Sequence, residues 1–285
     1  MSIAFLNDSY MPITEAKISP LDRGFLFGDG IYEVIPSYQG KLLGFKAHID
    51  RMLDGLSGIG LKLNWSHSDW QDMCEKLAIE NGNGNLGIYL QVSRGADIKR
   101  YHAFPEAVSP TVFCFTFDIT SPPVADKNRA KSYAVSTSED LRLQRCHIKS
   151  TALLGNVLHF QEGYDQGNDE TLLYNKRNEL TEASACNAFI VKDGVVITPP
   201  LDNQLLPGIT RNMLVDILRK DGSINVEERV VTMEEVRGAD EVWITSSTKE
   251  IGAVVSVDDA PVGDGKIGDV WLAAQALFSS HKYDY

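Results

Sequence analysis

Two adjacent prolines near the middle of the chain, Pro122 and Pro123, constrain its fold more than any other feature. Proline has no amide hydrogen to donate and disfavours a helical conformation in the residue before it, so such a pair interrupts both helices and central strands. The mostly polar residues around the pair, from Ser121 to Asn128, complete a typical interdomain linker. We therefore predict a small N-terminal domain over residues 1–120, a linker over 121–128 and a large C-terminal domain over 129–285.

Before the linker, the sequence predicts a sheet with two helices. Strand-like runs rich in β-branched and aromatic residues cover 3–6, 30–38, 41–45, 86–93 and 111–118. Apolar residues at helical spacing cover 47–56, and Ser68 is a suitable N-cap for a second helix.

After the linker, strands and helices alternate. Strands are predicted over 131–137, 188–192, 195–198, 225–231 and 241–245, and helices over 151–166, 210–219 and 270–278. Mixed elements in two unequal parts predict an α/β (α+β) fold of two domains. Cofactors often bind between such domains, so we expect a cofactor there.

Composition excludes several classes of function. The chain of 285 residues has a net charge of −12, which disfavours the clustered cations that nucleic acids require. It has no apolar run long enough for a membrane span, and its first residues lack the pattern of a signal peptide. Neither the four cysteines nor the six histidines show metal-ligand spacing. We therefore expect a cytoplasmic enzyme without a metal.

Four segments carry groups that could take part in catalysis or in ligand binding. Lys149 lies in an apolar-flanked segment before a predicted helix, where loss of solvation would free its amine as a nucleophile. Glu182 precedes a predicted strand among small residues. Residues 206–211 open a helix whose free N–H groups favour an anion, and hydroxyl side chains follow the strand that ends near residue 245. Each segment alone is a common surface feature, but together they supply what a phosphorylated pyridine aldehyde needs.

The segments belong to four motifs, in this order: Arg23-Gly-x-x-x-Gly-Asp-Gly-x-Tyr-Glu, Ile148-Lys149-Ser150-x-x-x-Leu-Gly-Asn156, Thr181-Glu182-x-Ser-x-x-Asn187 and Pro207-Gly208-Ile209-Thr210-Arg211. With them the chain resembles, from Phe5 to about Phe278, the fold-type IV pyridoxal-phosphate enzymes. This family includes D-amino-acid and branched-chain transaminases and aminodeoxychorismate lyase. The resemblance implies the family fold, pyridoxal 5′-phosphate as cofactor and a homodimer.

The resemblance also implies a role for each motif residue. Lys149 is similar to the catalytic lysine that forms a Schiff base with the cofactor, and Glu182 to the carboxylate that pairs with the pyridine nitrogen. The phosphate would be bound by Arg51, Ile209, Thr210, Ser246 and Ser247, and Leu206 would pack on the ring.

Residues 93–106 distinguish the members of the family. D-specific transaminases have an Arg-x-His pair in this segment, and this chain has Arg100 and His102. Alternation along an extended segment directs both side chains to one side, where a guanidinium and an imidazole would bind the substrate carboxylate together with Tyr32. Val34 is expected to line the side-chain pocket.

The predicted reaction is therefore a ping-pong transfer of the amino group from a D-amino acid to an α-keto acid such as 2-oxoglutarate or pyruvate. The alternatives are a branched-chain L-amino-acid transaminase, an aminodeoxychorismate lyase, an (R)-selective amine transaminase and a non-catalytic cofactor-binding protein.

Overall fold

The computed structural model describes residues 2–285, which form two compact units. The first contains residues 2–121 with 148–153 and Tyr285, and the second contains 122–147 and 154–284. The segment 148–153 therefore packs with the first unit although it follows the linker in the chain. Each unit has its own sheet with helices, which confirms the predicted mixed α/β class.

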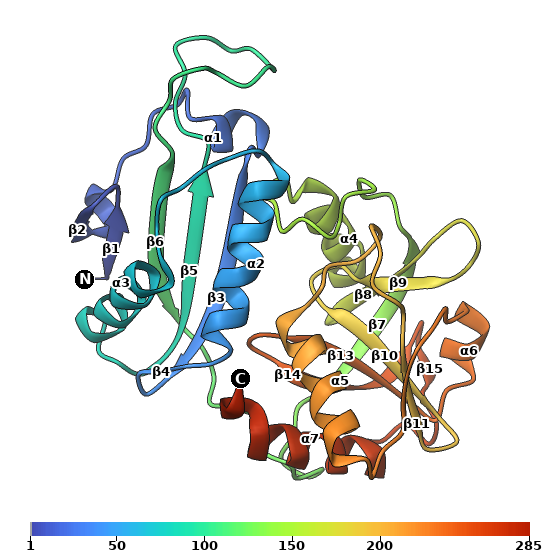
Figure 1. Ribbon diagram of the computed structural model, residues 1–285. Helices are drawn as coiled ribbons and strands as arrows, with labels where there is room; N and C mark the ends of the chain where they lie inside the picture. The colour runs from blue at the N-terminus through green and yellow to red at the C-terminus, as the bar shows by residue number, and fades with distance from the viewer. Residues whose placement is uncertain (1) are drawn as a thin grey trace. The chain divides into compact units, whose positions relative to one another are not determined.

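The first unit is built on a six-stranded antiparallel sheet with the order β2-β1-β6-β5-β3-β4 (Figure 1). Its strands are β1 (Ile3–Leu6), β2 (Ser9–Pro12), β3 (Gly30–Tyr38), β4 (Lys41–Leu42), β5 (Asn85–Ser93) and β6 (Thr111–Asp118). The long central strands closely match the predicted runs. The predicted strand over 41–45 is wrong beyond Leu42, because Gly44 adopts a φ of +62° and is the N-cap of a helix that begins at Phe45.

The helices of this unit are α1 (Arg23–Phe27), α2 (Phe45–Gly58) and α3 (His67–Glu80), with a short 3₁₀ helix η1 (Ile13–Glu15). Helix α3 begins after Ser66, not after the predicted Ser68. Ser66 and Asp69 form a reciprocal capping box, in which each side chain binds the other residue's backbone N–H. Helices α2 and α3 pack on one face of the sheet and share one apolar core with it, which includes Ile31, Ile49 and Trp70.

The second unit has a nine-stranded sheet with the order β12-β11-β10-β13-β14-β7-β8-β9, and β15 also pairs with β14. Its strands are β7 (Ser132–Glu139), β8 (Glu170–Tyr174), β9 (Leu180–Ala183), β10 (Asn187–Lys192), β11 (Val195–Thr198), β12 (Val226–Glu228), β13 (Glu241–Ser246), β14 (Glu250–Val257) and β15 (Ala260–Pro261). Parallel pairs join β14 to β7, β7 to β8 and β11 to β12.

The helices of the second unit are α4 (Leu154–Asp165), α5 (Ile209–Asp221), α6 (Met233–Arg237) and α7 (Asp269–His281), followed by the 3₁₀ helix η2 (Lys282–Asp284). The helix predicted over 151–166 begins only at Leu154. The residues before it are held in extended pairing with β3, so they are not available for the first helical turn. Among residues 2–285, no helix has the length and apolar character to cross a membrane.

Candidate active site

Lys149 lies beside strand β3 in the first unit. The Tyr32 N–H donates to the Lys149 carbonyl at 3.1 Å, and the Thr151 N–H donates to the Gly30 carbonyl at 2.9 Å. The Lys149 ammonium in turn donates to the Tyr32 hydroxyl at 3.1 Å and lies 4.2 Å from the centre of that ring. Backbone pairing therefore fixes the position of the half-buried lysine side chain against the Tyr32 phenol.

A buried charge network starts from the next residue of β3, Glu33. Arg51 donates from Nε and Nη2 to the two Glu33 oxygens at 2.6 and 2.7 Å, and His48 Nδ1 lies 2.7 Å from Oε2. Burial opposes the ionisation of Glu33, but the Arg51 charge and the two partners' hydrogen bonds outweigh it and lower the pKa to about 2. Burial also lowers the pKa of His48, although Glu33 opposes this, and the charges of Arg51 and Lys149 lower it further. Lys149 and Arg51 therefore contact adjacent residues of β3, Tyr32 and Glu33.

Tyr32 and Val34 point to the same face of β3 because side chains alternate along a strand. Tyr32 stacks on Tyr89 with ring centres 5.6 Å apart, and Val34 is paired in register with Tyr89. Both predicted residues therefore lie on the face of the strand opposite the core residue Ile31.

Arg100 and His102 lie on the long connection between β5 and β6, where both are exposed. Each contacts Phe27: the Arg100 guanidinium lies 5.3 Å from the ring centre, and the His102 ring centre lies 5.3 Å from it. Within residues 2–285, no hydrogen bond or ring contact joins Tyr32 to either residue. Arg100 and His102 therefore lie against the same ring, and their joint role with Tyr32 in binding a substrate carboxylate stays a prediction.

In the second unit, Glu182 lies on β9 and is almost fully buried. Arg142 Nη1 donates to its Oε1 at 2.5 Å, and the Leu206 N–H and Asn187 Nδ2 each donate to Oε2 at 3.1 Å. Arg142 also binds Asp140 at 2.7 Å. Burial raises the pKa of Glu182 to about 7, and the Arg142 charge and the Leu206 N–H oppose this rise.

In the second unit, Asn187 lies beside the start of α5 and the end of β13. Gly208 precedes α5 and approaches Asn187 so closely that an added Cβ would collide with Oδ1. Asn187 also pairs in register with Thr245, next to Ser246 and Ser247. Helix α5 begins at Ile209 and Thr210 without a side-chain cap, so its first N–H groups suit an anion. The buried Thr245 hydroxyl has no hydrogen-bond partner among residues 2–285.

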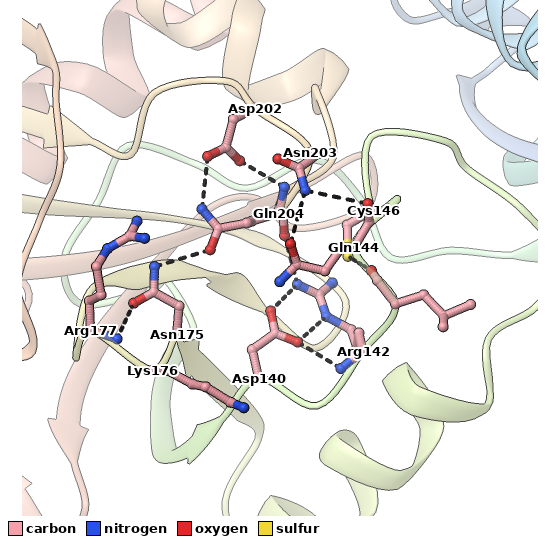
Figure 2. A pocket seen from close by; sticks show the side chains of 11 residues that line it. Asp140, Arg142, Gln144, Cys146, Asn175, Lys176, Arg177, Asp202, Asn203 and Gln204 are labelled. Carbon is pink, nitrogen blue, oxygen red and sulfur yellow. Dashed lines mark hydrogen bonds and ion pairs between the residues drawn. The ribbon is translucent and has the colours of Figure 1, made fainter.

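A polar pocket of about 450 Å³ is lined in part by Arg142 (Figure 2). None of the residues predicted to bind cofactor or substrate lines it. Its lining residues are Asp140, Arg142, Leu143, Gln144, Cys146, Asn175, Lys176, Arg177, Asp202, Asn203 and Gln204. Most of their polar groups bind one another, as Asp140 and Arg142 do.

Sequence reasoning did not assign roles to Glu33, His48, Arg142 or Asn187. Three of them had a usable signal, and one of these, Glu33, is the last residue of the first motif. His48 and Arg51 are three residues apart on a helix, a spacing that places both on one face, and Asn187 closes the motif that contains Glu182. Arg142 had no such signal, because its contact with Glu182 joins residues 40 positions apart.

Comparison with known proteins gives concordant results. The sequence profile described as amino-transferase class IV matches residues 30–257. The D-alanine aminotransferase of Listeria monocytogenes is 37% identical over 273 residues, which are 96% of this chain and 93% of that protein. The branched-chain aminotransferase of Escherichia coli has a similar structure, with a TM-score of 0.88, 23% identity and coverage of 98% of this chain and 94% of that one. The branched-chain aminotransferase of Thermobaculum terrenum in its PLP form gives a TM-score of 0.87, at 20% identity and coverage of 99% and 94%.

Proposed function

This chain belongs to the class IV aminotransferase family, and we propose that it is a pyridoxal-phosphate-dependent transaminase that acts on D-amino acids. The family and fold expected from the motifs are confirmed. The observation that carries the proposal is the position of Lys149, whose amine is held at 3.1 Å from the Tyr32 hydroxyl by backbone pairing with β3. D-alanine aminotransferases at 37% identity over nearly the whole chain support the choice of substrate.

The residues of the second unit suit a phosphorylated pyridine. The uncapped start of α5 at Ile209 and Thr210, together with Ser246 and Ser247, offers N–H and hydroxyl donors for a phosphate. Gly208 leaves room for close backbone approach, and the unpartnered Thr245 hydroxyl is a further donor. We assign phosphate binding to these groups and to Arg51, and packing on the ring to Leu206.

Lys149 and Glu182 have the chemical properties that their proposed roles require. When bound, pyridoxal phosphate withdraws electrons from the α-carbon of the attached substrate. Lys149 would bind the cofactor aldehyde and then move the proton at the α-carbon. Glu182 would face the pyridine nitrogen, and Arg142 would favour the ionised carboxylate there. The amino group would pass to a keto acid such as 2-oxoglutarate or pyruvate in a ping-pong cycle.

We attribute the selectivity for D-amino acids to the groups that would bind the substrate carboxylate, namely Arg100, His102 and Tyr32. A carboxylate held on one side of the α-carbon decides which hydrogen meets Lys149. Val34, on the same face of β3 as Tyr32, would contact the substrate side chain.

A homodimer in the cytoplasm is the proposed form of the enzyme. The face of the first sheet that carries Tyr32 has a row of aromatic side chains, the half-buried Tyr89, Phe115 and Phe113 and the exposed Phe117, with neighbouring ring centres 5.0–6.2 Å apart. Aromatic residues are enriched at protein interfaces. The four free cysteines are compatible with a reducing compartment.

We also propose an N-terminal domain over 1–120, a linker over 121–128 and a C-terminal domain over 129–285, from which the segment 148–153 is excepted.

A branched-chain L-amino-acid transaminase is the second candidate, because the similar solved structures include enzymes of that name. A panel of D- and L-amino acids with 2-oxoglutarate and pyruvate decides between them. We expect D-alanine to exceed L-leucine as amino donor, and the reverse order would reject the D-specific assignment. Release of pyruvate from aminodeoxychorismate without a keto acid would instead indicate the lyase.

A further inference from the structure

The connection between β5 and β6, residues 94–110, contains no helix or strand and carries Arg100 and His102. Connections this long are uncommon in compact domains and are often functional. Its conformation is held through its backbone. Arg23 donates from Nη1 to the Tyr101 carbonyl at 2.6 Å and from Nη2 to the His102 carbonyl at 3.2 Å. The buried guanidinium thus binds the backbone of the predicted substrate-binding segment, and the side chains of Arg100 and His102 stay exposed.

Asp29 fixes this guanidinium from the other side. Its Oδ2 accepts a hydrogen bond from Arg23 Nε and one from Arg94 Nε, both at 2.8 Å, and its Oδ1 accepts one from Arg94 Nη2 at 3.0 Å. Burial opposes the ionisation of Asp29, but the hydrogen bonds and charges of the two arginines outweigh it and lower the pKa. One carboxylate therefore balances two buried cations.

Arg94 extends the cluster to two further segments. Its Nη2 donates to the Ile59 carbonyl at 2.7 Å, just after α2, the helix that carries Arg51. Its guanidinium also lies 3.6 Å from the centre of the Phe104 ring, on the far side of the connection. Asp29 itself directly precedes β3, which carries Tyr32. The cluster therefore joins the β5–β6 connection to the residue that follows α2 and to the start of β3.

We propose that Arg23, Asp29 and Arg94 form a positioning cluster that sets the conformation of residues 94–110, and thereby determines the affinity for the substrate carboxylate and the preference for the D-configuration. The link to substrate rests on the proposed function, whereas the restraint of the connection does not. These residues are positioning residues, because they act through Arg100 and His102.

The planar guanidinium explains why arginine occupies position 23. Its fixed fork of donors binds a carboxylate on one edge and two carbonyls on the other, whereas an ammonium is a single point with three donors. Arg23→Lys therefore retains the charge beside Asp29 and loses the carbonyl contacts.

Limited proteolysis with trypsin tests the restraint, because Lys99 and Arg100 are exposed cleavage sites within the connection. We expect Arg23→Lys and Asp29→Asn to speed cleavage at these sites by about tenfold or more, the equivalent of one lost charge-assisted hydrogen bond. Arg237→Lys and Asp72→Asn, exposed residues on α6 and α3, are matched controls that should cleave at the wild-type rate. A folded Arg23→Lys protein with the wild-type rate overturns the proposal.

Phe104→Ala is the second variant, in case both substitutions in the cluster prevent folding. Phe104 is 60% exposed, so its removal costs little packing, and it takes away the ring that Arg94 contacts. Faster cleavage at Lys99 and Arg100 supports the cluster, and an unchanged rate rejects it.

Steady-state kinetics tests the link to substrate. In variants whose connection is cleaved faster, we expect KM for D-alanine to rise about tenfold, kcat to change less, and the ratio of D- to L-alanine activity to fall. Faster cleavage with unchanged KM and unchanged D to L ratio rejects the link. Arg100→Ala separates the two proposals: if that variant keeps the wild-type KM, the assigned role of Arg100 fails, and the proteolysis still decides the cluster.

Discussion

Arg142 donates a hydrogen bond of 2.5 Å from Nη1 to Oε1 of Glu182, with about 5% of each side chain exposed. A buried carboxylate depends on such a partner, because removal from water favours its neutral form. Asp140 binds the same guanidinium and holds it in place. The ionisation of Glu182, on which its proposed role depends, is therefore controlled by a residue outside the four motifs.

Arg142→Met should destabilise the cofactor-free protein by about 3–5 kcal/mol at pH 8, because it leaves Glu182 buried without its cation. The loss should be smaller at pH 5. The pKa of Glu182 is about 7 in the folded protein and near 4.5 in the unfolded chain. Such a carboxyl contributes to the free energy of unfolding below pH ~4.5, and this contribution is lost as the pH rises through about 7. Removing Arg142 raises that pKa further. Urea unfolding at both pH values measures the difference, and Glu182→Gln added to Arg142→Met should abolish it.

Glu33 should make the protein sensitive to acid. Its pKa is lowered from 4.5 to about 2, so its contribution is present above pH ~4.5 and is lost as the pH falls towards 2. The contribution is about 3 kcal/mol, since one pKa unit corresponds to about 1.4 kcal/mol. Urea unfolding between pH 3 and pH 7 should show a loss in the wild type that Glu33→Gln largely removes. The exposed control Asp72→Asn should keep the wild-type profile, and a Glu33→Gln profile of the same shape would contradict the prediction.

Lys149→Ala should remove nearly all transaminase turnover, by more than about 10²-fold, because the variant loses both the amine and the proton carrier. Borohydride reduction followed by peptide mass spectrometry should attach the cofactor to Lys149 in the wild type and to no peptide in the variant. Lys46→Ala, which removes a lysine 77% exposed in the same unit, serves as the control. Turnover near the wild-type level in Lys149→Ala would show that another residue carries the cofactor.

Arg100→Ala should raise KM for D-alanine by about tenfold to a hundredfold, since a hydrogen bond to a charged group contributes about 1.5–3 kcal/mol. Cofactor affinity, measured by titration of the cofactor-free protein, should stay unchanged. The neighbouring exposed residue gives a close control, Lys99→Ala, which should keep the wild-type KM. Equal effects of the two substitutions would indicate a general loss of positive charge.

Gly208→Ala should weaken cofactor binding and destabilise the protein by about 1–3 kcal/mol, the usual cost of overpacking. The new Cβ would collide with Asn187 Oδ1, so Asn187 would have to release Glu182 or Leu206. Gly84→Ala is the matched control, because its Cβ meets no atom within 4 Å. Thermal unfolding and cofactor titration measure both effects, and wild-type values for Gly208→Ala would show that Asn187 can move freely.

The sequence predicted the strands and helices that are marked by their own residues and by the residues next to them. Strands β3 and β6 have the predicted bounds, and both are rich in β-branched and aromatic residues. Strand β9 was not predicted, since its four residues, Leu180–Ala183, are a strand only through pairing with β8. The start of α4 was misplaced for the same reason, because β3 holds the residues before Leu154.

Candidate site residues could be named from the sequence where a motif marks residue type and spacing, as for Lys149 and Glu182, whose roles stay proposals. The partners that set their charge and position were not, because those contacts join distant parts of the chain. Arg142 binds Glu182 across 40 positions, and Arg23 binds Tyr101 across 78. Neither separation leaves a periodic or local pattern in the sequence.

The pairing of residues 148–153 with β3 has a consequence for biosynthesis. The ribosome must complete more than half of the chain before the first unit can acquire the segment that bears Lys149. A truncated product ending at residue 121 would contain every named strand of the first sheet, but the Tyr32 N–H and the Gly30 carbonyl would lack their partners. The two units are therefore not modules that gene fusion could exchange at the proline pair, because Lys149 packs with the first unit but follows the linker in the sequence.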